Sequence, residues 1–300
     1  MHAPLAQGFG GLFGRTAHRA VEYSFDADRS AYGMMVGGDM DLLPAIWQFS
    51  GLIGFAGQWA WSTRNWCRAV QPDRLLFRVD WQDRDCRALT LYCRFPQPPD
   101  DTLFASLVRA CWPFRWDGPP PGAAAQPLGV PGPRGVALRV DAAGRHMMAI
   151  YYRVEKSTNE AQALLAPLFE AAGLPAERAD AAAAELKKLY RPGPIGVIGL
   201  DCSGPDGSAV IKFDPSNVPL PVGLSYVAGK GCEAARATEL AALANAFRAV
   251  CFSYLGTKFC AAGTAGWRVY FSLEPWRMRS ALAAACSGQS DRPSMRFPYL

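Results

Sequence analysis

The sequence is poor in the residues on which metal and hydrolytic chemistry depend. Only three of its 300 residues are histidines, and its nine cysteines are scattered without a single C-x-x-C pair. This spacing suits neither a zinc site nor a disulfide framework, and it favours reduced thiols. The aspartate-rich motif D-D-x-x-D and the phosphate loop G-x-x-x-x-G-K-[ST] are also absent. A metal centre or a Ser-His-Asp triad would therefore depend on one of three histidines.

Charge and long apolar runs are scarce as well. Only 19% of the residues are charged, and the net charge of +5 is too small and scattered for wrapping nucleic acid. The longest apolar stretch, residues 51–61, falls short of the roughly 20 residues that span a membrane. No basic segment precedes an apolar core near residue 1, as it does in a secretion signal. We therefore expect a cytoplasmic monomer or weak dimer with no nucleic-acid or membrane partner.

Apolar residues are abundant. They make up 50% of the sequence, which suffices for a sizeable core. The proline- and glycine-rich stretches 113–133 and 215–231 are interpreted as loops, because both are too short and too embedded to link domains. We expect a single domain over residues 1–300.

Alternating apolar and polar residues predict five β-hairpins. The paired runs are residues 18–26 with 32–36, 74–80 with 87–95, 135–141 with 147–154, 195–202 with 209–214, and 252–261 with 266–274. Helical patterns are predicted at residues 39–58, 100–111, 157–172, 176–190, 232–250 and 275–287. The predicted order is therefore strand, strand, helix, repeated five times along the chain.

Each predicted hairpin has one apolar and one polar face. In residues 74–80, Leu75, Phe77 and Val79 share one face, while Arg78 and Asp80 share the other. The amphipathic helices are the obvious cover for the apolar faces. The fold class is then α+β, a ten-stranded antiparallel β-barrel surrounded by α-helices, with the polar faces lining a cavity. The alternative is an open sheet whose polar face lies in water.

The polar faces repeat arginine, lysine and tyrosine. Buried guanidinium and ammonium groups suit a diphosphate, and tyrosine rings stabilise a cation through their π faces. An anion clamp combined with a cation cage fits the ionisation of a diphosphate ester to a carbocation. This combination points to prenyl transfer.

Three segments resemble the ABBA-type aromatic prenyltransferases. Residues 79–110 and 145–174 are similar to the strand-turn-strand-helix unit that this family repeats, and A-V-E-Y-S at residues 20–24 is similar to the E-Y-S motif of its indole-type members. The resemblance implies Friedel-Crafts transfer of a dimethylallyl or geranyl group from its diphosphate to an indole, a phenol or an aromatic side chain of a peptide. The length of the chain also resembles the cyanobactin-type peptide prenyltransferases.

The resemblance also implies roles for individual residues. Glu22 is the candidate base that removes the ring proton. The candidate shields of the allylic cation are Tyr92, Tyr151 and Tyr270. The candidate diphosphate ligands are Arg78, Arg94, Arg139, Arg153, Lys212, Lys258 and Arg268. Thr90 stands where family members often have Lys or Asn. No protein side chains are predicted to bind a metal, and the resemblance leaves Mg²⁺ open as a companion of the diphosphate.

Two other functions remain compatible with the sequence. The barrel could be a non-catalytic carrier of an anionic or apolar small ligand. Alternatively, the tryptophan-rich region from Trp47 to Trp66 could dock a partner protein, which would be favoured if the fold had no cavity at all.

Overall fold

The computed structural model describes twelve segments of the chain. They are residues 20–26, 31–55, 57–82, 85–95, 134–153, 165, 169–170, 173–175, 177–189, 195–201, 210–260 and 263–273. The helices predicted at 100–111 and 275–287 and the loop predicted at 113–133 lie outside these residues, and the helix predicted at 157–172 is described only at Leu165, Phe169 and Glu170.

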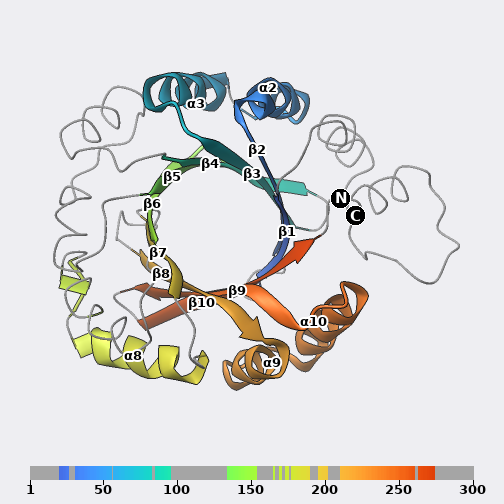
Figure 1. The fold of residues 1–300 in the computed structure, drawn as a ribbon, viewed down its shortest axis with the longest axis vertical. Helices are drawn as coiled ribbons and strands as arrows, with labels where there is room; N and C mark the ends of the chain where they lie inside the picture. Colours follow the sequence, from blue (N-terminus) through green and yellow to red (C-terminus); the bar gives the residue numbers. More distant parts are fainter. Residues whose placement is uncertain are drawn as a thin grey trace, which may run out of the picture.

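The described strands form one ring of antiparallel pairs. Each strand pairs with its neighbour in the chain, and the first pairs with the last, which closes the barrel. The strands are β1 (Ala20–Asp26), β2 (Ala31–Gly38), β3 (Arg74–Gln82), β4 (Asp85–Arg94), β5 (Gly135–Asp141), β6 (His146–Arg153), β7 (Ile195–Asp201), β8 (Val210–Pro219), β9 (Cys251–Cys260) and β10 (Gly263–Leu273). Figure 1 looks into this ring and shows the helices outside it. Closure leaves no strand edge unpaired.

The helices cover the outer face of the ring. They are α2 (Leu43–Leu52), α3 (Gly57–Val70), α8 (Glu177–Leu189), α9 (Leu220–Gly229) and α10 (Ala234–Ala246), with a short 3-10 turn, η1 (Met40–Leu42), before α2. In Figure 1, α2 and α3 lie over β2 to β4, while α8, α9 and α10 lie on the opposite side of the barrel.

The apolar faces of the strands point outward to these helices. The Phe77 ring of β3 packs against Phe49 of α2 and Trp59 of α3, with ring centroids 5.9 and 6.4 Å apart. The Trp59 indole also donates a hydrogen bond to the Leu138 carbonyl of β5. The core therefore lies between ring and helices, and the predicted α+β class with an antiparallel sheet and covering helices is confirmed.

Two predicted elements were wrong. The helix predicted at 39–58 spans η1, α2 and only the first two residues of α3, and the rest of α3 was not predicted. The chain turns between α2 and α3 at Gly54, whose φ of 73° favours glycine. The loop predicted at 215–231 contains the end of β8 and all of α9. Pro221 lies in the first turn of α9, where a missing backbone N–H costs no hydrogen bond, so this proline starts a helix.

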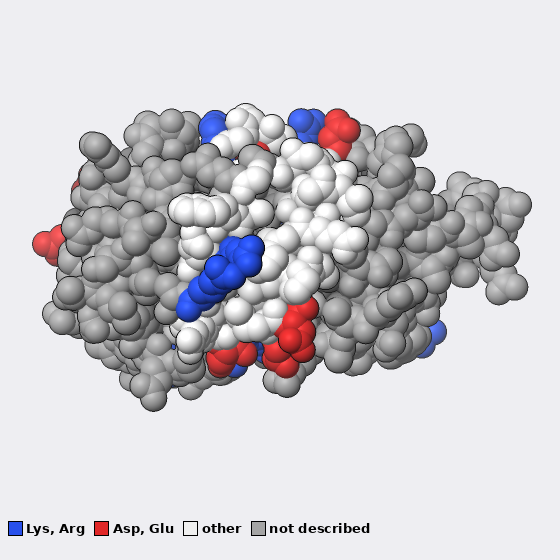
Figure 2. Space-filling model, turned by 90° about the horizontal axis from the view of Figure 1, so that it is seen from above, with Lys and Arg blue, Asp and Glu red and all other residues white. Residues whose placement is uncertain are grey.

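The side of the molecule that carries α2 and α3 is only partly apolar on its surface. Seen from that side, the described surface is mostly uncharged, with basic residues across its middle and further basic and acidic residues at its borders (Figure 2). Trp61 of α3 is 59% exposed, whereas Trp59 and Trp66 are fully buried. No helix in the described part of the chain has the length and apolar character to cross a membrane.

Replacing Phe77 by Ala tests the outward packing of the strands. The substitution removes a fully buried ring that contacts two helices, so we expect the free energy of unfolding to fall by about 3–5 kcal/mol. Chemical denaturation measures this change. The matched control, Trp61→Ala on the exposed surface of α3, should stay within about 0.5 kcal/mol of the original protein. Equal losses in both variants would contradict the packing described here.

Candidate functional site

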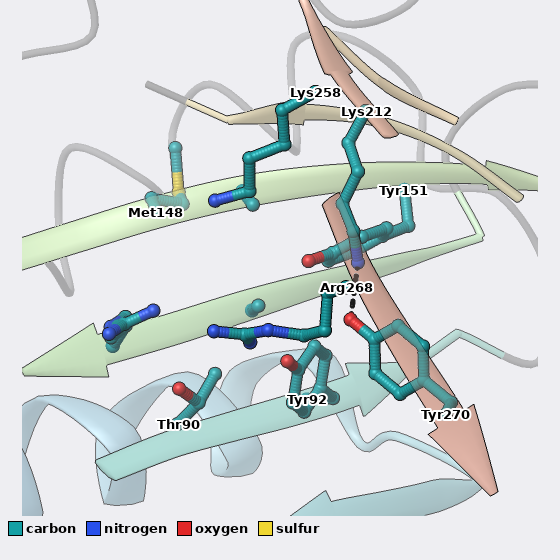
Figure 3. Close-up of a pocket in the computed structure, with 11 residues that line it drawn as sticks. Thr90, Tyr92, Met148, Tyr151, Lys212, Lys258, Arg268 and Tyr270 are labelled. Carbon is teal, nitrogen blue, oxygen red and sulfur yellow. Dashed lines mark hydrogen bonds between the residues drawn. The ribbon is translucent and has the colours of Figure 1, made fainter. Parts of the chain in front are cut away.

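The residues that alternate with the outer apolar face surround a cavity inside the ring. Its empty volume is about 420 Å³, which includes space open to solvent. The neutral lining comes from Thr90, Ala137, Met148 and Ala149. The remaining lining residues are basic or phenolic (Figure 3).

Basic side chains enter the cavity from four strands. Arg139 of β5, Lys212 of β8, Lys258 of β9 and Arg268 of β10 all line it. Arg78 of β3 is only 2% exposed and lies in the same network. Five of the seven predicted diphosphate ligands thus come together inside the ring.

The carboxylate of Asp80 joins three of these cations. Its Oδ1 accepts a hydrogen bond from Arg78 Nε at 2.7 Å and lies 2.6 Å from another guanidinium nitrogen of Arg78. Arg139 and Arg268 approach the same carboxylate at 3.5 and 3.9 Å. Burial by itself would raise the pKa of Asp80, but the three guanidinium groups outweigh it and hold this pKa well below its usual range. Asp80 is therefore ionised and fixes the positions of three arginines.

A second ion pair lies across the cavity. Lys212 Nζ contacts Asp214 Oδ2 and also donates to Tyr270 Oη, at 2.8 Å in each case (Figure 3 draws the latter). Gly256 of β9 makes room for the pair, because a Cβ there would lie 2.2 Å from Asp214 Oδ1. Any larger residue at position 256 would displace Asp214.

The three predicted cation shields all line the cavity. The rings of Tyr92 and Tyr151 lie 5.8 Å apart between their centroids. Tyr270 packs edge-on against Tyr254 at 6.2 Å, and the Arg78 guanidinium lies 5.6 Å from the Tyr270 ring centroid. The cavity thus has aromatic faces beside its cations.

Two predicted diphosphate ligands, Arg94 and Arg153, and the predicted base, Glu22, are not among the described residues that line the cavity. Arg94 ends β4, does not line the cavity, and has a 51% exposed side chain bound to Asp73, with contacts of 2.6 and 2.9 Å. The partner lies there because Asp73 directly precedes Arg74, which is opposite Arg94 in the register. The side chains of Arg153 and Glu22 lie outside the described residues. The register does place Glu22 opposite Met35, which in turn lies opposite Arg78.

Sequence reasoning missed the glycines that shape the site. A Cβ on Gly199 of β7 would lie 2.9 Å from the Tyr151 ring, so this glycine sets how closely that ring approaches the sheet. The signal for Gly256 was present, because alternation puts Tyr254, Gly256 and Lys258 on one face of β9.

In the part of the chain that the structure describes, no group of three or more His, Cys, Asp or Glu side chains is placed to hold a metal ion. Asp80 and Asp214 are both already ion-paired with basic residues. Magnesium bound together with a diphosphate stays a prediction.

Replacing Asp80 by Asn tests the role of this carboxylate as an anchor. The substitution leaves buried guanidinium groups without their counterion, so we expect the free energy of unfolding to fall by about 3–5 kcal/mol at pH 7. The pKa of Asp80 is lower in the folded than in the unfolded chain, so its stabilisation is complete above about pH 4 and is lost as the pH falls further. The variant should lose that part of the acid dependence in denaturation curves between pH 2 and 7. An unchanged slope would show that Asp80 does not anchor the network.

Comparison with known proteins bears on the fold alone. No protein-family model and no curated protein matches the sequence. Solved structures do match. 6-Dimethylallyltryptophan synthase from Micromonospora olivasterospora, solved in complex with DMASPP and Trp, is similar with a TM-score of 0.55 and 12% identity over 86% of this chain and 82% of that chain.

A second similar structure is AnaPT from Neosartorya fischeri, with a TM-score of 0.55 and 11% identity over 84% of this chain and 77% of that chain. A third, also a 6-dimethylallyl tryptophan synthase, has the same TM-score at 11% identity over 85% and 80%. The chain therefore has the fold of these aromatic prenyltransferases, as its resemblance to the ABBA type predicted.

Proposed function

We propose that the protein is an aromatic prenyltransferase. It moves a dimethylallyl or geranyl group from its diphosphate to an electron-rich aromatic acceptor by carbocation alkylation. The observation that carries this proposal is the convergence of four basic and three phenolic side chains on one cavity inside the ring, with Arg78 beside them in the network of Asp80.

The distribution of charge supports an anionic ligand. Lys212 and Lys258 lie directly opposite each other in neighbouring strands and both line the cavity, so two ammonium groups reach the same part of its wall. Arg78, Arg139 and Arg268 all approach the single carboxylate of Asp80, and Lys212 pairs with Asp214. Guanidinium and ammonium groups placed in this way bind the oxygens of a diphosphate and stabilise the charge that grows as it departs.

The aromatic faces support a cationic intermediate. Tyr92, Tyr151 and Tyr270 surround the same cavity as the cations, so an allyl group attached to a bound diphosphate would lie among their rings. The rings also exclude water, which would otherwise capture the carbocation.

The similar structures support the same chemistry. Two are named as dimethylallyltryptophan synthases, and one of these was solved with DMASPP and Trp. We infer from them that an indole is the first acceptor to test. Phenols and peptides with aromatic side chains, including macrocycles of the cyanobactin type, are the next.

The decisive experiment is an assay of turnover. The protein is incubated with dimethylallyl or geranyl diphosphate and a panel of indoles, phenols and aromatic peptides, with and without Mg²⁺. A prenylated product by mass spectrometry together with release of diphosphate supports the proposal. Tight binding of the prenyl diphosphate with no product from any acceptor would instead favour the carrier function.

Replacing Arg268 by Gln tests the diphosphate site. Arg268 lines the cavity, so the loss of its charge should raise KM for the prenyl diphosphate about 10- to 100-fold. The control is Arg94→Gln, which removes an exposed cation paired with Asp73 away from the cavity and should leave KM unchanged. Equal effects of both variants on KM would show that nonspecific charge attracts the substrate.

Replacing Glu22 by Gln tests the predicted base. If the carboxylate accepts the ring proton, turnover should fall about 10²- to 10⁴-fold while affinity for the diphosphate substrate stays unchanged. The control Glu177→Gln alters an exposed residue of the outer helix α8 and should have no effect on turnover. Full activity of the Glu22 variant would exclude this residue as the base.

A further inference from the structure

The three cavity tyrosines have different surroundings. Tyr92 and Tyr151 pack ring against ring. Tyr270 is set apart because its hydroxyl oxygen accepts a hydrogen bond from the Lys212 ammonium group at 2.8 Å. An oxygen that already accepts from a cation keeps its own O–H as a donor, and a negative charge on that oxygen would be stabilised.

The position of Lys212 is itself fixed. Asp214 Oδ2 lies 2.8 Å from Lys212 Nζ, and both side chains are buried. The absence of a side chain at Gly256 leaves the space that this pair occupies. Asp214, Lys212 and Tyr270 thus form a chain of contacts that ends at a phenol on the cavity wall.

Positive charge surrounds the Tyr270 ring. Lys212 Nζ lies 5.0 Å and the Arg78 guanidinium 5.6 Å from its centroid. Burial is the largest influence on the pKa of Tyr270 and raises it, but Lys212, Arg78 and Arg268 outweigh burial and Asp214, so this pKa lies below its usual value. For Tyr92 burial prevails, and the pKa of its phenol is raised.

Charged and titratable groups from five strands of the barrel lie around Tyr270. The described ones are Arg78 of β3, Tyr92 of β4, Lys212 and Asp214 of β8, Tyr254 of β9, and Arg268 of β10. On the β1 side the register sets Ser24 opposite Tyr270, and the ionisable residues Glu22 and Asp26 lie two positions away along the strand.

We propose that Tyr270 is the general acid that protonates the departing diphosphate, positioned by Lys212 and Asp214. This inference rests on the proposed function and adds to it a catalytic role for one hydroxyl group. The diphosphate gains negative charge as its bond to the allylic carbon breaks, so a proton delivered at that moment stabilises the leaving group.

The electron pair of the C–O bond goes to the diphosphate oxygen, and that oxygen takes the proton from Tyr270 Oη. The phenolate that remains is stabilised by the Lys212 ammonium group. The aromatic acceptor attacks the allylic cation, its ring proton leaves to the base and from there to solvent, and Tyr270 regains one proton from solvent.

Replacing Tyr270 by Phe keeps the ring and removes the proton. We expect kcat to fall at least about 100-fold with KM little changed, because general acid catalysis acts on the transition state. The matched variant, Tyr92→Phe, keeps a shielding ring whose hydroxyl has no role in this step, so its kcat should fall less than about tenfold. Equal losses in the two variants would overturn the proposal. Isothermal titration with inorganic diphosphate checks that the anion site of the Tyr270 variant is intact.

The pH profile gives a readout that a purely shielding role would not change. An acid works only when protonated, so kcat of the original protein should decline at alkaline pH, starting below the ordinary tyrosine pKa of about 10. Tyr270→Phe should lose this decline, and Tyr92→Phe should retain it. A decline that persists without the Tyr270 hydroxyl would overturn the proposal.

Titration of the ligand-free protein separates this proposal from the proposed function. The ultraviolet absorbance of tyrosinate should show one tyrosine ionising early, and Tyr270→Phe should remove that transition. A prenylated product combined with an ordinary Tyr270 titration would overturn the acid role alone. An early transition combined with no product from any acceptor would overturn the proposed function, and the acid role with it.

Discussion

Like charges confined inside a closed ring of strands are the constraint on which this structure depends. Arg78, Arg139, Lys212, Lys258 and Arg268 are held close together, and each would be better solvated in water. Asp80 and Asp214 offset part of that cost by pairing with them. The same arrangement therefore bears both on the stability of the barrel and on the proposed binding of a diphosphate.

The architecture keeps this arrangement rigid. Every strand of the ring is hydrogen-bonded on both sides, so the residues that carry the charges have fixed backbones. On the outer face, Phe77 packs with Phe49 and Trp59 and buries the apolar side of β3 against α2 and α3. Groups held in this way need little reorganisation when charge develops on a substrate, and this is the condition under which electrostatic stabilisation of a transition state is most effective.

Much of the fold and part of the site follow from the alternation of residues along the strands. The residue runs predicted as hairpin strands have nearly the same bounds as the observed strands. Residues 135–141, for example, coincide with β5. Alternation also placed Arg78, Tyr92, Lys212, Arg268 and Tyr270 on the inner faces, because a strand sends successive side chains to opposite sides. It failed where local signals were ambiguous. Pro219 and Pro221 suggested a loop although α9 begins there, and the spacing of Trp59, Trp66 and Cys67 on one face of α3 was not recognised as helical.

The sequence by itself therefore determined which side chains face inward, since period-two alternation is a property of the local backbone. Only the tertiary structure decided which of them meet. Arg94 has the same inward parity as Tyr92, yet it lies at the end of β4 and binds Asp73, because strand length and register decide how far the ring extends past the cavity. Asp80 and Arg139 are 59 positions apart in the chain, and Lys212 and Tyr270 are 58 positions apart, yet each pair is in contact. Such contacts depend on closure of the ring of strands, and no local pattern of residues encodes which distant residues will meet.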